Sequence, residues 1–480
     1  MSEKLLARFK DIDSSYTDFK RYQEPTTDRD AAKSAFIDDE TWAPEFSYPK
    51  IDKFYDSFDD SDKESKNDTD KSIAKKKTKV QLAVFALDRI STESPEAALY
   101  ADYHQVRLQR IMLNEASYHM MTAGTEEARW VAAEEFRTIG QELYGEMDQA
   151  LFAGLLGAEK QRVLEFEPKT EIAEKIKADL QSFFDSSDTE LGATAELISP
   201  EALARIHEAL RARYPDIINV FESADQSVMF DAESAAELIN QALEAGGLKA
   251  GGWKAVVDKK KQTPATSPNL KKISLPANLS RNAAQLLRLT MHEQEVHARR
   301  AFNGDATGYK VLQNGTADYA DVEEGLGVLF EAAISGSFAG PATARAEERY
   351  IAAGIATGLF GPARDARQTH EILWRILAVK SHPTGEISNE NVLAAKKAST
   401  VHIENAFRGT PTTMPGVIYP KLKVYYEGLV KNCRLFEEYE GDMNELLDEV
   451  LAGKYDHTSP KEKELVFELI GQTQSATIKG

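Results

Sequence analysis

The sequence predicts a mainly helical α+β protein. Apolar residues recur three and four positions apart in VQLAVFALDRI, QVRLQRIMLNEASYHMM and EEFRTIGQELYGEMDQALFAGLLG, which is the period of an amphipathic helix. The pattern changes at Gly252, where GGWKAVVDKK and KKISLPAN alternate apolar and polar residues around a Pro/Thr/Ser/Asn turn region. This alternation predicts a hairpin or two short strands.

Three regions follow from these patterns. Residues 1–80 include YDSFDDSDKESKNDTDKSIAKKKTKV, which is polar and poor in apolar residues, and we expect a charged, flexible N-terminal segment. Residues 81–250 read as helices that form the first part of one folded unit. Residues 251–480 contain the hairpin, two helices with the segments HEQEVH and VEEGLG, an FRG/YY region and a C-terminal helix.

Composition limits the partners and the compartment. The net charge is -20, from 58 basic and 78 acidic side chains, which argues against nucleic acid because such binding needs clustered Lys and Arg. The single cysteine, Cys433, excludes an internal disulfide and a cysteine metal site, and it indicates a reducing compartment. The N-terminus lacks the apolar core of a signal peptide, and no apolar run is long enough for a transmembrane helix. We therefore expect a soluble, cytoplasmic protein without a membrane partner.

The segment LRLTMHEQEVHARRAFNG places His292, Glu293 and His297 on one apolar-flanked helix, and VEEGLGVLFE is a second such helix with adjacent carboxylates. Two imidazoles and one carboxylate form a known catalytic zinc ligand set, with a fourth position left for water. Glu293 is then placed to accept a proton from that water. The pattern predicts one Zn²⁺ per chain, although a polar helix face in a binding protein fits the same residues.

The spacing of the two histidines has a structural consequence. The familiar zinc-peptidase helix reads HExxH, whereas this one reads HExxxH. Residues five apart on an ideal α-helix differ in direction by roughly 140°, too far to share one ion. A π-bulge, with about 4.4 residues per turn, brings them to one side, and such bulges cluster at functional sites. We therefore expect a bulged or bent helix between His292 and His297.

The order of the elements fits a peptidase. The predicted strands stand immediately before the HEQEVH helix, and an exposed strand can pair with an extended peptide and lay it across a metal. This order predicts a zincin-like metallopeptidase core, with a short edge β-sheet before the metal helix.

Three segments together carry a family resemblance. HEQEVHARRAFNG, then YADVEEGLGVLFE, then AFRGTPTTMPGVIYPKLKVYYEG resemble the family that includes the microtubule-associated tyrosine carboxypeptidases and the bacterial QEGLA-motif proteins, over roughly residues 85–440. The resemblance implies that His292 and His297 are the histidine ligands, Glu293 the general base and Glu324 the carboxylate ligand. Glu323 is then a group beside the ligands or on the surface.

The resemblance is not complete. The family's TKD stretch reads Pro420-Lys421-Leu422 here and loses its acid, and Gly327 stands where alanine is usual. These departures bear more on substrate specificity than on the metal site. The tubulin-directed members imply an aromatic terminal residue in the substrate.

Hydrolysis also needs groups that bind the substrate. An oxyanion needs a donor besides the metal, and a Tyr hydroxyl or an Arg is the usual solution, so we expect Tyr425 to act there, with Tyr426 the alternative and core packing possible for either. A carboxypeptidase needs a cation for the terminal carboxylate, which the fork of an arginine fits well. Arg408 is the first candidate and Lys421 the second, with structural salt bridges as the other interpretation.

These residues predict a zinc metallopeptidase, and in particular a carboxypeptidase that removes a C-terminal residue from a peptide or protein. Two alternatives remain: a metal-dependent hydrolase of a non-peptide amide or ester, and a non-catalytic helical binding protein. The sequence does not indicate the oligomeric state.

Overall fold

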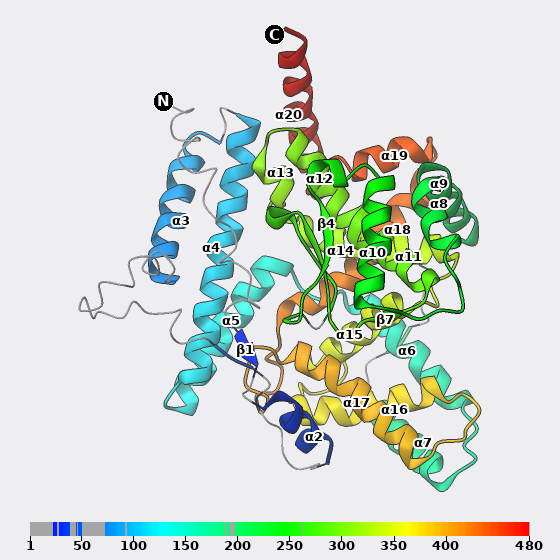
Figure 1. The fold of residues 1–480 in the computed structure, drawn as a ribbon. Coiled ribbons are helices and arrows are strands. Elements are labelled where there is room, and N and C mark those ends of the chain that lie inside the picture. The colour runs from blue at the N-terminus through cyan, green and yellow to red at the C-terminus, as the bar shows by residue number, and fades with distance from the viewer. Residues whose placement is uncertain are drawn as a thin grey trace.

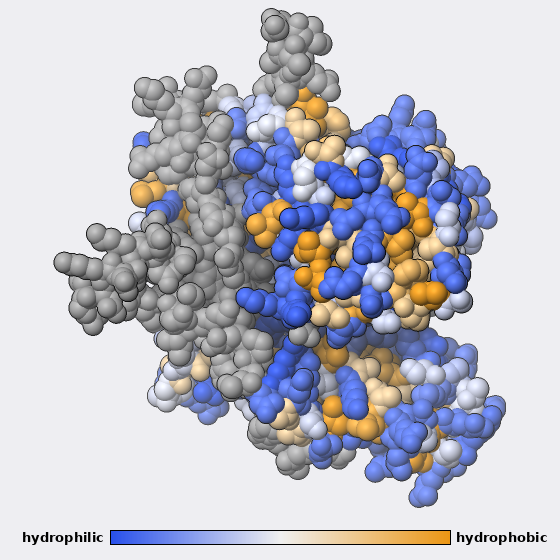
Figure 2. Space-filling view, in the orientation of Figure 1, coloured by the Kyte–Doolittle hydropathy of each residue, from blue (hydrophilic) through white to orange (hydrophobic). Residues whose placement is uncertain are grey.

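The computed structural model describes residues 23–25, 28–38, 45, 47–49, 73–91, 94–187, 190–192, 197–261 and 263–479. Helices account for most of these residues, and short strands form one three-stranded and two two-stranded sheets. The predicted mainly helical α+β class is confirmed. No helix in the described part of the chain is both long and apolar enough to cross a membrane. Figure 2 shows small apolar groups scattered among hydrophilic side chains, as on ordinary protein surfaces.

The first part of the described chain is mainly helical, with one pair of short strands. Its elements are β1 (Gln23–Pro25), α2 (Arg29–Asp38), β2 (Ser47–Pro49), α3 (Ile73–Asp88), α4 (Pro95–Thr122), α5 (Glu126–Tyr144), α6 (Gln149–Glu165) and α7 (Glu171–Asp185). Helices α3 and α4 lie side by side (Figure 1). Side-chain oxygens of Ser94, Thr125, Asp148 and Thr170 accept backbone N–H groups at the starts of α4 to α7. These caps fix where each helix begins.

The flexible segment predicted over residues 1–80 lies largely outside the described residues. Within it, α2 packs against α17 (Asn389–Ala406), where Phe36 is fully buried. The Nζ of Lys33 also lies 2.8 Å from a carboxylate oxygen of Glu404. Apolar and ionic contacts thus hold α2 on the body of the protein. The division of the chain at residues 80 and 250 stays a prediction.

The central sheet follows three helices. These are α8 (Pro200–Arg213), α9 (Pro215–Glu222) and α10 (Ala232–Ala245). The sheet consists of β4 (Lys254–Val257), β5 (Ala265–Ser267) and β6 (Lys272–Leu275) in the order β4-β6-β5. A separate pair joins β3 (Phe230–Asp231) to β7 (Ser280–Arg281). Figure 1 shows α10 beside the sheet, and the two elements are in contact.

Strands β4 and β6 form where the alternating segments predict them, but they do not make a hairpin with each other, and β5 forms in the predicted turn region. Strands β4 and β6 run parallel, with Lys254 opposite Lys272 and Val257 opposite Leu275. Parallel neighbours need a long crossover connection, and the intervening chain supplies it because it contains β5. Strand β5 pairs antiparallel with β6. It therefore occupies an edge of the sheet, in contact with the helix that carries HEQEVH.

The rest of the chain is helical. In order, its elements are α11 (Ala283–His292), η6 (Glu293–Ala298), α12 (Arg299–Ala306), α13 (Lys310–Asn314), α14 (Tyr319–Ser335), α15 (Pro341–Thr357), α16 (Ala366–Ser381), α17, η7 (Pro420–Lys423), α18 (Val424–Glu438), α19 (Met443–Val450) and α20 (Pro460–Lys479). Helix α11 begins with a capping box, in which Asn282 accepts from the backbone of Gln285 and the Gln285 side chain accepts from that of Asn282.

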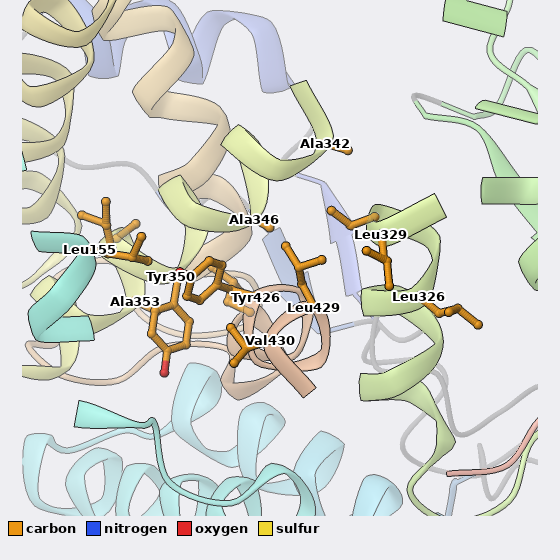
Figure 3. Close-up of a cluster of buried hydrophobic side chains, with 14 of the residues drawn as sticks. Leu155, Leu326, Leu329, Ala342, Ala346, Tyr350, Ala353, Tyr426, Leu429 and Val430 are labelled. Atoms are coloured by element: carbon orange, nitrogen blue, oxygen red, sulfur yellow. The ribbon is translucent and has the colours of Figure 1, made fainter. Parts of the chain in front are cut away.

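Helices α14 and α18 cross at two glycines. A Cβ atom at Gly325 would lie 2.0 Å from the carbonyl carbon of Gly428, and one at Gly428 would lie 1.9 Å from the carbonyl oxygen of Asp321. No larger residue fits either position without moving a helix. Figure 3 shows the apolar side chains around this crossing, including Leu329 from α14 and Leu429 from α18. The crossing fixes the start of α18 relative to α14, which carries Glu324.

Candidate metal centre

The helix that carries the two histidines is bulged. Residues Glu293–Ala298 form a π-helix between α11 and α12, and the backbone N–H of Arg299 donates to the carbonyl of Gln294, five residues back. The rings of His292 and His297 consequently lie on the same side, with centroids 4.9 Å apart. The bulge that HExxxH requires is therefore confirmed. The π-helical turn takes up the extra residue of HExxxH, so that the two histidines point in the same direction.

Glu324, on α14, completes a group of three potential ligands. One ligand atom from each of His292, His297 and Glu324 lies within 4.8 Å of the other two, and all three residues are half-buried. Two imidazole nitrogens and a carboxylate oxygen match a catalytic zinc ligand set. The chemistry of these donors, and their convergence from two packed helices, fit one divalent ion.

Each histidine has a carboxylate on its other ring nitrogen. The Nδ1 of His292 lies 2.8 Å from Oε1 of Glu331, and the Nδ1 of His297 lies 2.8 Å from Oε1 of Glu323. Such partners orient metal-binding imidazoles and leave Nε2 for the ion. Glu331 is seven residues after Glu324 and so lies on the same face of α14.

The imidazole of His292 is strongly coupled to its acidic surroundings. Burial opposes its protonation, but the hydrogen bond with Glu331 and the charges of Glu331, Glu293 and Glu324 outweigh burial and raise the pKa of His292 to about 9. This concentration of negative charge favours a cation at the imidazole.

Glu323 holds His297 through a buried charge network. Its Oε1 accepts from Nζ of Lys454 at 2.5 Å, and its Oε2 accepts from Nη1 of Arg300 at 3.1 Å. Burial favours the neutral acid, yet the charge of Lys454 and the hydrogen bond with His297 hold the pKa of Glu323 far below its usual range. Glu323 is thus a partner of the candidate ligand and not a surface group.

Removal of Lys454 tests this network. We expect Lys454→Met to lower the free energy of unfolding by about 3 kcal/mol, because breaking a buried ion pair leaves an incompletely compensated charge. We also expect zinc affinity to fall by roughly 10–100-fold, as for other groups that orient metal ligands. Urea unfolding and zinc titration measure the two effects. The double variant Glu323→Gln/Lys454→Met removes both charges and should regain part of the stability; equal stability of the single variant and wild type would contradict the network.

Glu293, the candidate general base, is buried beside strand β5. The hydroxyl of Thr266 donates to Oε2 of Glu293 at 2.7 Å and lies 3.1 Å from its backbone carbonyl oxygen. The edge strand thus fixes the carboxylate directly. The sequence predicted strands before this helix but placed residues 265–267 in the turn region between them, and nothing in it singled out Thr266.

The structure brings two further predicted residues to the site. The Nζ of Lys421 lies 3.9 Å from Oε1 of Glu324. Tyr425 is half-buried, and the charge of Glu324, followed by burial, raises the pKa of its hydroxyl. Tyr426 instead packs in the core, where its ring centroid lies 5.2 Å from that of Tyr350 (Figure 3). Of the two tyrosines, only Tyr425 adjoins the candidate ligands.

Arg408 lies in the same neighbourhood but donates to the last turn of the preceding helix, α17. Its Nη2 is 2.9 Å from Oδ1 of Asn405, and its charge acts on the Tyr425 hydroxyl.

Gly327 explains one departure from the family pattern. A Cβ atom at this position would lie 2.7 Å from Nε2 of His292 and 2.8 Å from two ring carbons. The imidazole therefore packs directly on the backbone of α14, in space that an alanine methyl group would occupy.

An alanine at this position should displace the ring. We expect Gly327→Ala to weaken zinc binding by roughly 10–100-fold, the range for changes that misorient a ligand, while the fold persists because the clash involves a side chain. Zinc titration measures the affinity, and circular dichroism of the same variant shows whether the fold persists. Unchanged affinity would show that the His292 ring has room to shift without loss of the ion.

Comparison with known proteins bears on these residues. Residues 160–357 match the family model of the microtubule-associated tyrosine carboxypeptidases. The match confirms the family resemblance found in the sequence. Its span includes the two histidines, Glu293 and Glu324, and it ends with α15, before Arg408, Lys421 and Tyr425. Searches of curated proteins and of solved structures gave no match.

Proposed function

We propose that this protein is a zinc-dependent carboxypeptidase that removes the C-terminal residue of a peptide or protein. The observation that carries the proposal is the convergence of His292, His297 and Glu324 on one point beside Glu293. The match to a tyrosine carboxypeptidase family supports the reaction class and favours tyrosine as the released residue.

Zinc fits the donors better than other ions. A set of two histidines and one glutamate is typical of catalytic zinc, and the only cysteine, Cys433, is free and buried elsewhere. A bound zinc ion would supply a water of lowered pKa and polarise the scissile carbonyl. The absence of any internal disulfide, since Cys433 is the only cysteine, also supports our proposal that the protein is cytoplasmic.

Two side chains perform the proton transfer and stabilise the oxyanion in this reaction. Glu293 accepts a proton from the attacking water. The hydroxyl of Thr266 holds the carboxylate of Glu293 in place. As the C–N bond breaks, Glu293 returns the proton to the leaving amine, so that water is divided between a new C-terminal carboxyl group and a free amino acid. The hydroxyl of Tyr425 donates a hydrogen bond to the developing oxyanion. A tyrosine hydroxyl is protonated at neutral pH, and the charge of Glu324 and burial raise the pKa of Tyr425 further.

Strand β5 is suited to bind the substrate chain. In the sheet it pairs with β6 on one side, and its Thr266 contacts the general base. An extended peptide that added to its free edge would lie across the metal helix, since main-chain hydrogen bonds give affinity without demanding a particular sequence.

Metal analysis and peptide profiling test the proposal. The purified protein should contain about one zinc per chain, and His292→Ala should contain less. A peptide library with free and amidated C-termini should be cleaved only at free C-termini, one residue from the end. Internal cleavage would indicate an endopeptidase, zinc without peptide cleavage would indicate another amide or ester hydrolase, and the absence of bound zinc would indicate a binding protein.

A further inference from the structure

We propose that Arg349 binds the terminal carboxylate of the substrate and thereby makes the enzyme a carboxypeptidase. The inference rests on the proposed function and names the residue that restricts cleavage to the chain end. It also revises the expectation from the sequence, which favoured Arg408 and then Lys421.

The packing of α15 against α18 places Arg349 beside Tyr425. The guanidinium carbon of Arg349 lies 4.8 Å from the ring centroid of Tyr425. The next residues along each helix, Tyr350 and Tyr426, pack together in the core (Figure 3). The two helices are therefore in a register that buries one pair and leaves the other beside Glu324, whose charge acts on the Tyr425 hydroxyl.

Arg349 lacks an anionic partner among the described residues. It is half-buried, its Nε is inaccessible and has no hydrogen-bond partner, and no ion pair joins it to a described carboxylate. The neighbouring carboxylates of α15 are engaged elsewhere, since Glu347 and Glu348 both contact Lys380. A buried guanidinium nitrogen without a hydrogen-bond partner costs free energy, and a carboxylate is the ligand that would remove this cost.

The other two cations are less suited to this role. Lys421 lies 3.9 Å from Glu324, and its charge is offset by that candidate metal ligand. Arg408 donates to Asn405. Arg349 is free to offer its planar fork, which a carboxylate can bind with two parallel hydrogen bonds, and the ring of Tyr425 supports the cation from one face.

The distances in a peptide fit this placement. The terminal carboxylate lies one residue beyond the scissile carbonyl, and consecutive Cα atoms are about 3.8 Å apart. A cation that selects for a free C-terminus must therefore adjoin the groups that act on the scissile bond. Arg349 meets this requirement because it stacks on Tyr425, the proposed oxyanion donor.

Binding to a zinc-loaded, full-length Glu293→Gln protein tests the inference without turnover. The probes are a short peptide that ends in tyrosine with a free carboxyl group and the same peptide with a C-terminal amide. We expect the free acid to bind about 10–100-fold more tightly, the range for hydrogen bonds to a charged group. Adding Arg349→Gln should abolish that difference and leave amide binding unchanged, and Arg349→Lys should restore part of it.

Arg375 provides a matched control. It is also stacked on an aromatic ring, 4.3 Å from the centroid of Trp374, but it pairs with Asp179 and Glu371. Arg375→Gln should keep the preference for the free acid, since it removes a stacked arginine whose charge is already neutralised. A general loss of structure would weaken both peptides equally, so the ratio of the two affinities isolates the carboxylate contact.

The outcomes separate the two proposals. Retention of the free-acid preference in Arg349→Gln, or its absence from the Glu293→Gln protein, overturns the inference about Arg349. In either case, hydrolysis that depends on Glu293 would still support the proposed peptidase function. Conversely, wild-type protein that does not hydrolyse the peptide but binds its free acid through Arg349 would overturn the peptidase function. The carboxylate-binding role of Arg349 would then be retained.

Discussion

Glu293→Gln should lower kcat for hydrolysis by about 10²–10⁴-fold, the contribution of a positioned general base. The variant should keep its zinc. Glutamine has the same shape and can keep the hydrogen bond with Thr266, but it cannot accept a proton from water. The three candidate ligands are untouched. Zinc content and kcat for a peptide with a free C-terminus measure the two quantities in the same preparation.

Glu295→Gln is the control for this change. Glu295 stands in the same π-helix and is fully buried, but its carboxylate pairs with Arg299 at 3.0 Å. The chemical change is the same in both variants, but the carboxylate of Glu295 binds Arg299 and takes no part in the proposed proton transfer. We expect Glu295→Gln to lower stability and keep most of kcat. Equal activity of Glu293→Gln and wild type would sink the proposed mechanism.

Local rules were sufficient to predict the centre of the site. The spacing of His292 and His297 is incompatible with one ion on an ideal helix, so a ligand role required a bulge, and the π-helix lies at that position. The adjacent carboxylates of VEEGLG were also visible in the sequence; Glu324 converges with the two histidines, and Glu323 lies on His297. Both features depend on residues close in the chain, where helical geometry determines direction.

Groups that come from distant segments were not predictable in the same way. Lys454 reaches Glu323 across 131 positions, and no local pattern connects them. Arg349 and Tyr425 meet only because α15 and α18 pack in a particular register. Glu331 had a signal that was missed: it follows Glu324 by seven residues on one helix and therefore shares its face.

The sheet shows a related limit. Alternation located the segments of β4 and β6 correctly but carries no information on whether two strands run parallel or antiparallel. The third strand, β5, is only three residues long, and such a length gives almost no alternation to detect. Its position beside the metal helix is nevertheless what brings Thr266 to Glu293.

Gly325→Ala should lower the free energy of unfolding by about 1–3 kcal/mol or more, the cost of overpacking a tight core. The added methyl group would lie 2.0 Å from the backbone of Gly428, and backbone atoms cannot move aside as a side chain does. Relief requires α14 and α18 to separate. Separation would move Lys421 and Tyr425 away from Glu324, so activity should fall together with stability.

Gly471→Ala is the matched comparison, because it introduces the same methyl group in a helix where nothing lies within 4 Å. Alanine is preferred over glycine in a helix by roughly 1 kcal/mol, so this change should be neutral or stabilising. In urea unfolding, the free energy of unfolding should therefore fall for Gly325→Ala and stay the same or rise for Gly471→Ala. If Gly325→Ala were as stable as Gly471→Ala, the helices would not cross at their backbones. Tyr425 would then need another explanation for its place beside the candidate ligands.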